Sequence, residues 1–406
     1  MRILHTADWH LGKKLDQFER TDEHQDFLDW LIGTLDTEKI DVLIVAGDIF
    51  DTGSPSNTAL EQYYGFLVQV KNTYCREVII IGGNHDSIST LNAPKELLKY
   101  LNVHVIGGVP EVFADQIIPI RDRNGKIELI VCAVPFLRDR DIRLSISGET
   151  SEEREIRIKE GIQAHYHRFK EHLHPYTLEK IPIIATGHLF AAGSSTSESE
   201  KEIHVGNLGQ VRGDQFPEEF NYVALGHIHR PQVVNKMEHV RYSGSPISLS
   251  FSEHEDKKLV VIVEFGANEN MAVRLLQVPS NRELVRIKGT WEKVRDKILL
   301  LEDRQMKYPA WVEVQVETDS YLPDLEEQLT RLKHGKKHIE HFFPRQVRTR
   351  VLPALDQLSE EVDTLTDLDP KTVFLKKCQS ELGEADITEL VQTFDEALEQ
   401  LRQREG

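Results

Sequence analysis

Residues 42–51 read VLIVAGDIFD, five apolar residues that lead directly into a glycine and an aspartate. An apolar run of this length, rich in β-branched residues and ending at a glycine, predicts a strand buried on both faces. Asp48 then leaves the strand at its C-terminal end, and in open α/β sheets this is the end where sites are built. We therefore expect a buried strand at 42–46 that presents Asp48 to a functional site.

Four further segments combine a predicted strand end with His, Asp or Asn. They are Asp8-Trp9-His10, Gly83-Asn84-His85-Asp86, Gly187-His188 and Gly226-His227-Ile228-His229. A single D-x-H or G-H pair is usually surface decoration or structural. All five segments, in this order and mostly placed directly after apolar runs, indicate instead that one site is assembled from several strand ends.

Up to about residue 280, short apolar runs alternate with amphipathic stretches, which predicts a layered α/β or α+β domain. The predicted strands are Arg2–Thr6, Val42–Ala46, Val78–Ile81, Leu129–Val134, Ile181–Thr186, Tyr222–Leu225, Val240–Tyr242 and Leu259–Phe265. The predicted helices are His24–Leu35, Ser56–Lys71, Ala93–Leu101 and Glu152–His172.

The pattern changes near Pro279, where a smaller unit begins. Leu284–Lys288 and Trp311–Val316 alternate as strands, and Ser320–Lys333 has the pattern of a helix. After Pro344, helical segments follow, and the last of them carries an apolar stripe that could dock on its own domain or on a partner. We expect a main domain at 1–278, a second domain at 279–343 and a helical region at 344–406.

Composition sets the broad class of the protein. The chain has 406 residues, 39% hydrophobic and 29% charged, as expected of a folded globular protein. No secretory signal precedes Ile3 and no apolar stretch is long enough for a membrane helix, so we expect a cytoplasmic protein without a membrane span. The three cysteines, Cys75, Cys132 and Cys378, are widely spaced and indicate neither disulfides nor a thiolate zinc site.

The formal net charge is −18, which opposes binding to a polyanion such as DNA. Clustered metal ions, local basic residues or a basic partner protein would overcome this repulsion. The basic residues near the motifs are Lys13, Lys14, Arg20, Arg138, Arg140 and Arg230. Each of them is expected to be solvated surface charge or a phosphate contact.

The residue types at the strand ends decide the chemistry, because imidazole, carboxylate and amide groups without thiolates suit Mn²⁺, Fe, Zn²⁺ or Mg²⁺. The candidate ligands are Asp8, His10, Asp48, Asn84, His188, His227 and His229. These are more ligands than one ion with an open position can use, so two ions are expected. A carboxylate can bridge two ions, and Asp48 is the natural candidate. On an extended segment Asp8 and His10 would project to the same side.

The ordered set D-x-H, G-D-x-x-D, G-N-H-D, G-H and G-H-x-H resembles the calcineurin-like metallophosphoesterase superfamily over about residues 1–265. The flanking residues are more closely similar to nuclease subunits of double-strand-break repair complexes. The segments that carry this closer resemblance are 5–12 (HTADWHLG), 45–55 (VAGDIFDTGSP), 224–230 (ALGHIHR) and 242–246 (YSGSP). The resemblance implies an α+β fold, a four-layer α/β/β/α sandwich with a small α/β capping domain and C-terminal partner-binding helices.

The resemblance also implies a division of labour within the site. One Mn²⁺ would be held by Asp8, His10, Asp48 and His229, and the other by Asp48, Asn84, His188 and His227. His85 would stabilise the transition state or protonate the departing 3′ oxygen. Asp86 would orient the His85 ring, although a turn-forming aspartate is an equal alternative.

The expected reaction is hydrolysis by a metal-activated water that attacks phosphorus in line, without a covalent intermediate. Gly244-Ser245-Pro246 lacks the spacing of a nucleophile motif and is interpreted as a turn closing the hairpin that begins at Val240.

The resemblance further implies the substrate and the partner. The implied activities are 3′→5′ exonuclease action on duplex ends and endonuclease action on single strands and hairpins. The implied assembly is a homodimer of this chain bound to a coiled-coil ATPase. The chain has no G-x-x-x-x-G-K-[ST] motif of its own, which is consistent with a separate ATPase. The metal ligands alone do not choose among phosphate esters, so a nucleotide or phosphoprotein substrate is the alternative. A non-catalytic scaffold is disfavoured because the full ligand set is present.

Overall fold

The computed structural model describes residues 1–122, 124–143, 149–191, 194, 211–266, 271–318, 322, 324–348, 374, 391, 393 and 394. One compact unit comprises Met1–Val316 with Leu322–Gln346, and a second comprises Glu317–Tyr321 with Val347–Gly406. The predicted helical region 344–406, including its apolar stripe, lies largely outside the described residues.

The first sheet has the strand order β14-β13-β1-β4-β5-β6. Its strands are β1 Arg2–Thr6, β4 Val42–Ala46, β5 Glu77–Ile81, β6 Val103–Ile106, β13 Leu259–Phe265 and β14 Met271–Gln277. The neighbours β1, β4, β5 and β6 are parallel, with Thr6 opposite Val45 and Ala46 opposite Ile81. Three motif-bearing strands, β1, β4 and β5, therefore end at the same edge.

The second sheet has the order β11-β12-β10-β9-β8-β7. Its strands are β7 Ile117–Arg121, β8 Ile127–Cys132, β9 Ile183–His188, β10 Tyr222–Gly226, β11 Gln232–Val234 and β12 Met237–Tyr242. Here β9 and β10 are parallel, and their register places Gly226 opposite His188. The other two motifs therefore also end together.

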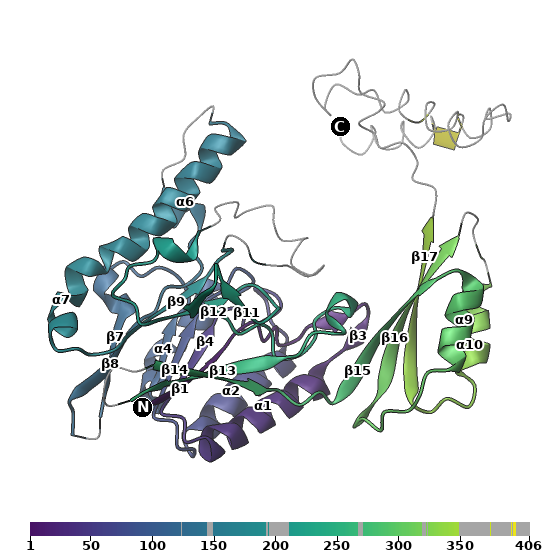
Figure 1. Cartoon of the computed structure of the whole chain (residues 1–406), viewed down its shortest axis with the longest axis horizontal. Helices are drawn as coiled ribbons and strands as arrows, with labels where there is room; N and C mark the ends of the chain where they lie inside the picture. The colour runs from purple at the N-terminus through teal and green to yellow at the C-terminus, as the bar shows by residue number, and fades with distance from the viewer. Residues whose placement is uncertain are drawn as a thin grey trace. The chain divides into compact units, whose positions relative to one another are not determined.

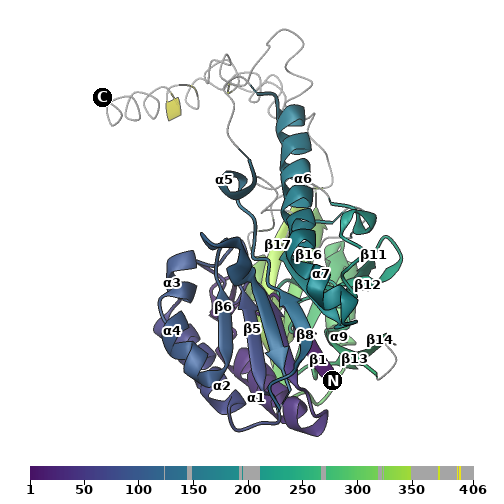
Figure 2. The same ribbon diagram turned by 90° about the vertical axis from the view of Figure 1, so that its left-hand side faces the viewer.

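The two sheets pack face to face and each carries helices on its outer face, as Figures 1 and 2 show. Ile44 and Ile79 of the first sheet share a buried cluster with Val131 and Ala224 of the second. The helices are α1 Thr21–Thr37 and α2 Asn57–Val70 on the first sheet, and α6 Ser151–Arg168 and α7 Lys170–Leu178 on the second. The structure confirms the predicted four-layer α/β/β/α sandwich.

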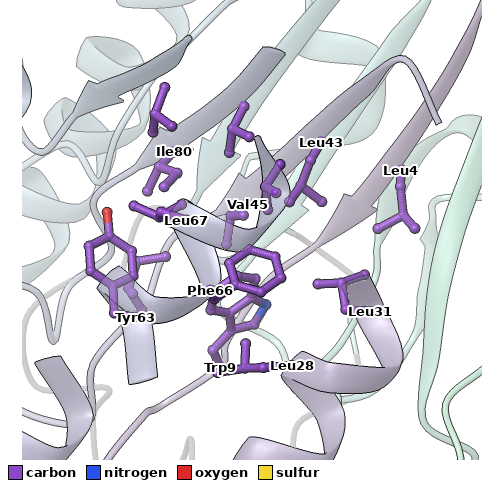
Figure 3. Packing of buried hydrophobic residues seen from close by; sticks show 14 of the residues in the cluster. Leu4, Trp9, Leu28, Leu31, Leu43, Val45, Tyr63, Phe66, Leu67 and Ile80 are labelled. Atoms are coloured by element: carbon purple, nitrogen blue, oxygen red, sulfur yellow. The ribbon is translucent and has the colours of Figure 1, made fainter. Parts of the chain in front are cut away.

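Alternate residues of β4 pack into two different hydrophobic cores, one on each face of the first sheet. Leu43 and Val45 of β4 point toward α1 and α2, as Figure 3 shows, whereas Ile44 between them faces the second sheet. Trp9, which separates two predicted metal ligands, is fully buried with its ring centroid 5.3 Å from that of Phe66 on α2. The core thus extends directly beneath the first motif.

A third sheet, β15-β16-β17, follows the sandwich and carries two helices on one face (Figure 1). Its elements are β15 Arg282–Gly289, α9 Trp291–Leu299, β16 Tyr308–Thr318, α10 Leu325–Lys333 and β17 Ile339–Arg348. A short hairpin of β2 Lys14–Leu15 and β3 Phe18–Glu19 packs against it, and Phe18 stacks on His341 with ring centroids 3.7 Å apart.

Several predicted elements differ in the structure. The remaining short elements are α3 Ile88–Asn92, α4 Lys95–Leu98, α5 Asp139–Ile142, η1 Lys99–Leu101, η2 Phe113–Gln116, η3 Gly213–Gln215 and η4 Phe251–Glu253. The single helix predicted at 93–101 is wrong: α4 and η1 share this stretch, and Pro94, which lacks a backbone N–H, separates α4 from α3.

The interpretation of Gly244-Ser245-Pro246 as a hairpin turn is also wrong. Strand β12 pairs with β11 across Asn235 and Lys236, both with positive φ, so that hairpin closes before β12 begins.

Among the described residues, no helix is long and apolar enough to cross a membrane.

Candidate metal centre

Five strand ends from both sheets converge on one site. Strands β1, β4 and β5 lead into Asp8, Asp48 and Asn84, and β9 and β10 lead into His188 and His227. The site is therefore built at strand ends, as predicted from the sequence. The strand ends come from two sheets, which the sequence did not indicate.

The backbone at the ligand positions is not extended as expected. Strand β1 ends at Thr6, and Asp8 and His10 have φ values of 54° and 46°. Asp48 and His227 also have positive φ, 49° and 99°. The left-handed conformation is unfavourable for most residues and is tolerated best by short polar ones. The chain turns where these strands end, and side chains from the two sheets meet there: Asp48 contacts His188, and Asp8 contacts the backbone of His227.

Two motif glycines are required by close packing around Asp48. A Cβ on Gly83 would lie 2.1 Å from Oδ1 of Asp48, and a Cβ on Gly47 would lie 2.3 Å from Nδ1 of His188. Gly47 also has φ of 90°, a conformation that side chains disfavour. The glycine of each motif therefore makes room for a predicted ligand from another strand.

Asp48 lies between two groups of predicted ligands. Its Oδ2 is 3.4 Å from Nε2 of His10 and 3.2 Å from Nε2 of His188. Its Oδ1 accepts a hydrogen bond of 3.0 Å from the backbone N–H of His85. This central position is the one a bridging carboxylate needs.

The first group consists of Asp8, His10 and His229, whose ligand atoms all lie within 4.8 Å of one another. Asp8 accepts a hydrogen bond from the backbone N–H of His227 through Oδ1, at 2.8 Å. Its Oδ2 is buried and has no hydrogen-bond partner among the described residues. A buried carboxyl oxygen left in this way fits a cation ligand.

The second group gathers around the side-chain oxygen of Asn84. This oxygen lies 2.9 Å from Nε2 of His188 and 3.0 Å from Nδ1 of His227. His188 donates its other ring N–H to the carbonyl oxygen of Ala46 at 2.9 Å. That bond fixes the ring and directs Nε2 toward Asn84 and Asp48, as expected for a histidine that ligates metal.

Burial and mutual charge perturb these groups strongly. Burial raises the pKa of Asp8 to about 7, a rise that His188 and His229 oppose and Asp48 reinforces. Burial acts likewise on Asp48, but the charge and hydrogen bond of His188 hold its pKa well below the usual range. Burial would lower the pKa of His188, yet Asp48 raises it to about 9. Two buried carboxylates with so few compensating charges fit a site for divalent cations.

His85 is held by a group that the sequence did not suggest. Its Nδ1 donates to the backbone carbonyl of Asp51 at 2.7 Å, and its buried Nε2 has no hydrogen-bond partner among the described residues. Asp86 instead accepts hydrogen bonds of 2.9–3.1 Å from the backbone N–H groups of Gly83, Ile49 and Phe50. Asp86 thus links the loop at Ile49 and Phe50 to the loop at Gly83, and the backbone carbonyl of Asp51 orients the ring of His85.

Sequence reasoning missed the side chains that contact the predicted ligands. Asp51 places Oδ1 3.3 Å from Nδ1 of His10 and 3.1 Å from Nζ of Lys13. Glu253 lies with Oε1 3.5 Å from Nδ1 of His229. The second aspartate of G-D-x-x-D was a visible signal for Asp51, whereas Glu253 comes from a separate segment and has no local signal.

The basic residues near the motifs have different surroundings. Lys13 faces the site through Asp51, and Arg138 donates to the carbonyl oxygen of Asp86 at 3.5 Å. Arg230 pairs with Asp256 at 3.0 Å. Lys14 and Arg140 are exposed and paired with Glu19 and Asp141. Arg20 is only 3% exposed and pairs with Glu23, so the expectation that it carries surface charge is wrong.

Comparison with known proteins agrees with this geometry. The model of the calcineurin-like phosphoesterase family matches residues 1–231, and a model described as the type 5 capsule protein repressor C-terminal domain matches residues 280–381. A protein of Escherichia coli (strain K12), named as the SbcD subunit of the nuclease SbcCD, is 36% identical over 406 residues, covering 99% of this chain and 98% of its own length.

Two other bacterial proteins of the same name are also similar. The one from Bacillus subtilis (strain 168) is 32% identical and covers 86% of this chain and 88% of its own length. The one from Rhodobacter capsulatus is 38% identical and covers 62% of this chain and 64% of its own length. The chain belongs to the calcineurin-like phosphoesterase family, and within it to the group of proteins named as SbcD subunits of the nuclease SbcCD.

Proposed function

We propose that this chain is the nuclease subunit of a DNA end-processing complex and hydrolyses phosphodiester bonds with two divalent metal ions, Mn²⁺ being the expected ion. The observation that carries the proposal is the convergence of the seven predicted ligand side chains and His85 at one site. The full-length similarity to proteins named as subunits of the nuclease SbcCD supports the choice of DNA over other phosphate esters.

The residues divide between holding ions and acting on the substrate. Asp8, His10 and His229 would hold one ion, Asn84, His188 and His227 the other, and Asp48 both. Two bound divalent ions would lower the pKa of a water and neutralise charge on the phosphate. Asp51 positions His10 through Oδ1 and His85 through its carbonyl oxygen.

His85 is the group available for proton transfer to the leaving oxygen. Because Nδ1 donates to the carbonyl of Asp51, Nε2 is the nitrogen left to face a substrate. Because Nδ1 keeps its hydrogen, His85 must act as the imidazolium, with a second proton on Nε2. In hydrolysis, the water oxygen forms a bond to phosphorus, the P–O3′ bond breaks and the imidazolium delivers its Nε2 proton to the departing oxygen, which leaves a neutral ring that takes up a new proton from solvent. The proton released by the water passes to solvent.

We further propose that this chain works in a complex with a second copy of itself and an SbcC-type coiled-coil ATPase. The complex would act on duplex ends and hairpins. The relatives are named as SbcD subunits of SbcCD, which supports the partner. The formal charge of −18 also supports it, because a partner would supply the basic surface for a polyanion.

Replacing His85 with alanine tests the catalytic assignment. We expect His85→Ala to lower Mn²⁺-dependent cleavage of linear duplex DNA by about 10²–10⁴-fold, because the leaving oxygen loses its acid. Mn²⁺ binding, measured by calorimetry, should persist. The matched control is His104→Ala, since His104 pairs with Glu77 on β5, away from the site. Full cleavage by His85→Ala would refute the role.

Substrate choice requires a second comparison with the wild-type protein. Cleavage of linear and hairpin-ended DNA, with and without the ATPase and ATP, should exceed hydrolysis of a nitrophenyl phosphodiester and of a phosphopeptide. Faster turnover of the phosphopeptide or of a free nucleotide than of DNA would overturn the nuclease proposal and favour the alternative phosphatase function.

A further inference from the structure

A buried ion pair lies directly behind His229. Glu253 is fully buried and Lys258 is 8% exposed, and Nζ of Lys258 donates a hydrogen bond to Oε2 of Glu253. Burying two charges is unfavourable unless geometry and further hydrogen bonds compensate for lost hydration. The contacts of this pair show what it holds in place.

The carboxylate of the pair faces the ring of His229. Oε1 of Glu253 lies 3.5 Å from Nδ1 of His229. The same ring lies 5.1 Å from the ring of His10, centroid to centroid, and contributes to the cluster with Asp8. A carboxylate at Nδ1 favours the tautomer with hydrogen on Nδ1, which leaves the Nε2 lone pair for a metal ion.

The lysine of the pair holds the main chain of the same residue. Nζ of Lys258 donates to the carbonyl oxygen of His229 at 3.2 Å and to Oγ of Ser245 at 2.9 Å. The backbone N–H of Ser245 donates to that same carbonyl at 3.1 Å. His229 is thus restrained at its ring by Glu253 and at its backbone by Lys258 and Ser245.

Glu253 is itself held by its own segment, which ends in η4. Its Oε2 accepts from the backbone N–H of Leu249 at 3.1 Å, and its Oε1 accepts from Oγ of Ser250 at 3.2 Å. Every one of these neighbours donates a hydrogen, as does Nδ1 of His229 in the favoured tautomer. The position therefore requires a group that only accepts, which is an ionised carboxylate.

We propose that Glu253 and Lys258 are positioning residues that fix the tautomer and orientation of His229 for the ion it shares with Asp8 and His10. This inference rests on the proposed two-metal function. It predicts a selective effect: loss of the pair weakens one of the two metal sites and leaves the site formed by Asn84, His188 and His227 intact.

Three variants separate positioning from simple stability. Glu253→Gln offers an amide N–H to neighbours that already donate, and it leaves the charge of Lys258 unpaired, so it should both weaken one metal site and lower stability. The double variant Glu253→Gln with Lys258→Met removes both charges, so the part of the lost stability that comes from the unpaired lysine should return. Glu253→Asp is a third variant, which retains a charge for Lys258 while its shorter side chain withdraws from His229.

The measurements are Mn²⁺ binding isotherms, with bound Mn²⁺ counted by electron paramagnetic resonance, and urea unfolding without metal. We expect the double variant and Glu253→Asp to bind one Mn²⁺ as the wild type does and the other about 10–100-fold more weakly. Glu23→Gln is the matched control, because Glu23 is also a buried, ion-paired carboxylate but contacts Arg20 and Arg282. It should lose stability and bind both ions normally.

The outcomes distinguish this inference from the function on which it rests. If the wild type binds fewer than two Mn²⁺ ions, the two-metal function fails, and this inference fails with it. If the wild type binds two, and the double variant and Glu253→Asp also bind two with unchanged affinity, only the positioning role is overturned, and the pair is structural.

Discussion

At the scale of single residues, the site depends on backbone conformations that most sequences avoid. Asp8, His10, Asp48 and His227 all have positive φ. Such conformations cost about 1–3 kcal/mol each and persist only where the surroundings impose them. The buried strands that precede these residues, and the packed Trp9 ring between Asp8 and His10, supply that constraint. Part of the stability of the sandwich is therefore used to hold the predicted ligands in place.

Gly83 makes this dependence testable with one methyl group. In Gly83→Ala the new Cβ would lie 2.1 Å from Oδ1 of Asp48, against backbone as well as carboxylate, so Asp48 must shift. We expect Mn²⁺ binding and DNA cleavage to be lost together, whereas loss of His85 removes cleavage alone. Calorimetry and a nuclease assay measure the two effects.

Gly65 is the matched control for that substitution. It lies within α2, where an added Cβ would meet nothing within 4 Å. Gly65→Ala should leave metal binding unchanged and stabilise the protein by about 0.5–1 kcal/mol, because alanine favours a helix more than glycine does. Normal Mn²⁺ affinity in Gly83→Ala would contradict the packing argument.

At the scale of elements, buried strands were predictable and exposed or short ones were not. The predicted ranges 2–6, 42–46 and 259–265 coincide with β1, β4 and β13. Strand β14 was missed: it is an edge strand with no buried side chain, and Arg274 interrupts its apolar residues. Strand β6 was missed because it has only four residues, too few for its alternating pattern to stand out.

In the candidate site, too, local sequence patterns predicted some features, and features that depend on contacts between distant segments were missed. Strand ends brought the predicted ligands together, because polar residues after apolar runs are a local pattern. The roles of Asp51 and Glu253 depend on contacts between segments far apart in the sequence. The positive φ of Asp8 is likewise imposed by the surrounding fold, since aspartate in a short loop adopts many conformations.

Helix α2 links core packing to the site through Phe66. This ring is 2% exposed and packs edge-on against Trp9, between two predicted ligands. We expect Phe66→Ala to lower the free energy of unfolding by about 3–5 kcal/mol, as other buried aromatic truncations do. It should also weaken Mn²⁺ binding, because Trp9 loses the surface that fixes its loop. Urea unfolding and calorimetry measure both.

A control on the same helix separates these two effects. Val68 lies on the exposed face of α2, and Val68→Ala should change neither stability nor Mn²⁺ affinity appreciably. If Phe66→Ala destabilises the protein while metal affinity stays the same, the proposed link from the core through Trp9 to the ligands is wrong.

At the scale of the whole molecule, buried charges connect the sandwich to the third sheet. Glu23 on α1 accepts hydrogen bonds from Arg20 and from Arg282 on β15, the latter at 3.1 Å. The guanidinium of Arg282 lies 4.4 Å from the ring centroid of Trp311 and also pairs with Glu340. Because Arg282 joins several partners at once, the third sheet is attached by an electrostatic junction as well as by apolar packing.

This junction should make stability depend on pH through Glu23. Burial alone would raise the pKa of Glu23, but Arg20 and then Arg282 hold it below its usual 4.5. The contribution of ionised Glu23 to the free energy of unfolding is therefore fully present above about pH 4.5. It is lost as the pH falls through the lower pKa that Glu23 has in the folded protein. At pH 7 we expect Glu23→Gln to cost about 3–5 kcal/mol, because two buried guanidinium groups lose a shared partner.

The difference between wild type and Glu23→Gln should shrink in acid, because protonation of Glu23 removes the same charge from the wild type. Urea unfolding at pH 7 and at about pH 3 measures this change. Glu96→Gln is the control: Glu96 is exposed and pairs with Lys99, one turn away, so no comparable loss is expected. An equal loss of stability in Glu23→Gln at both pH values would show that shape rather than charge holds the third sheet to the sandwich.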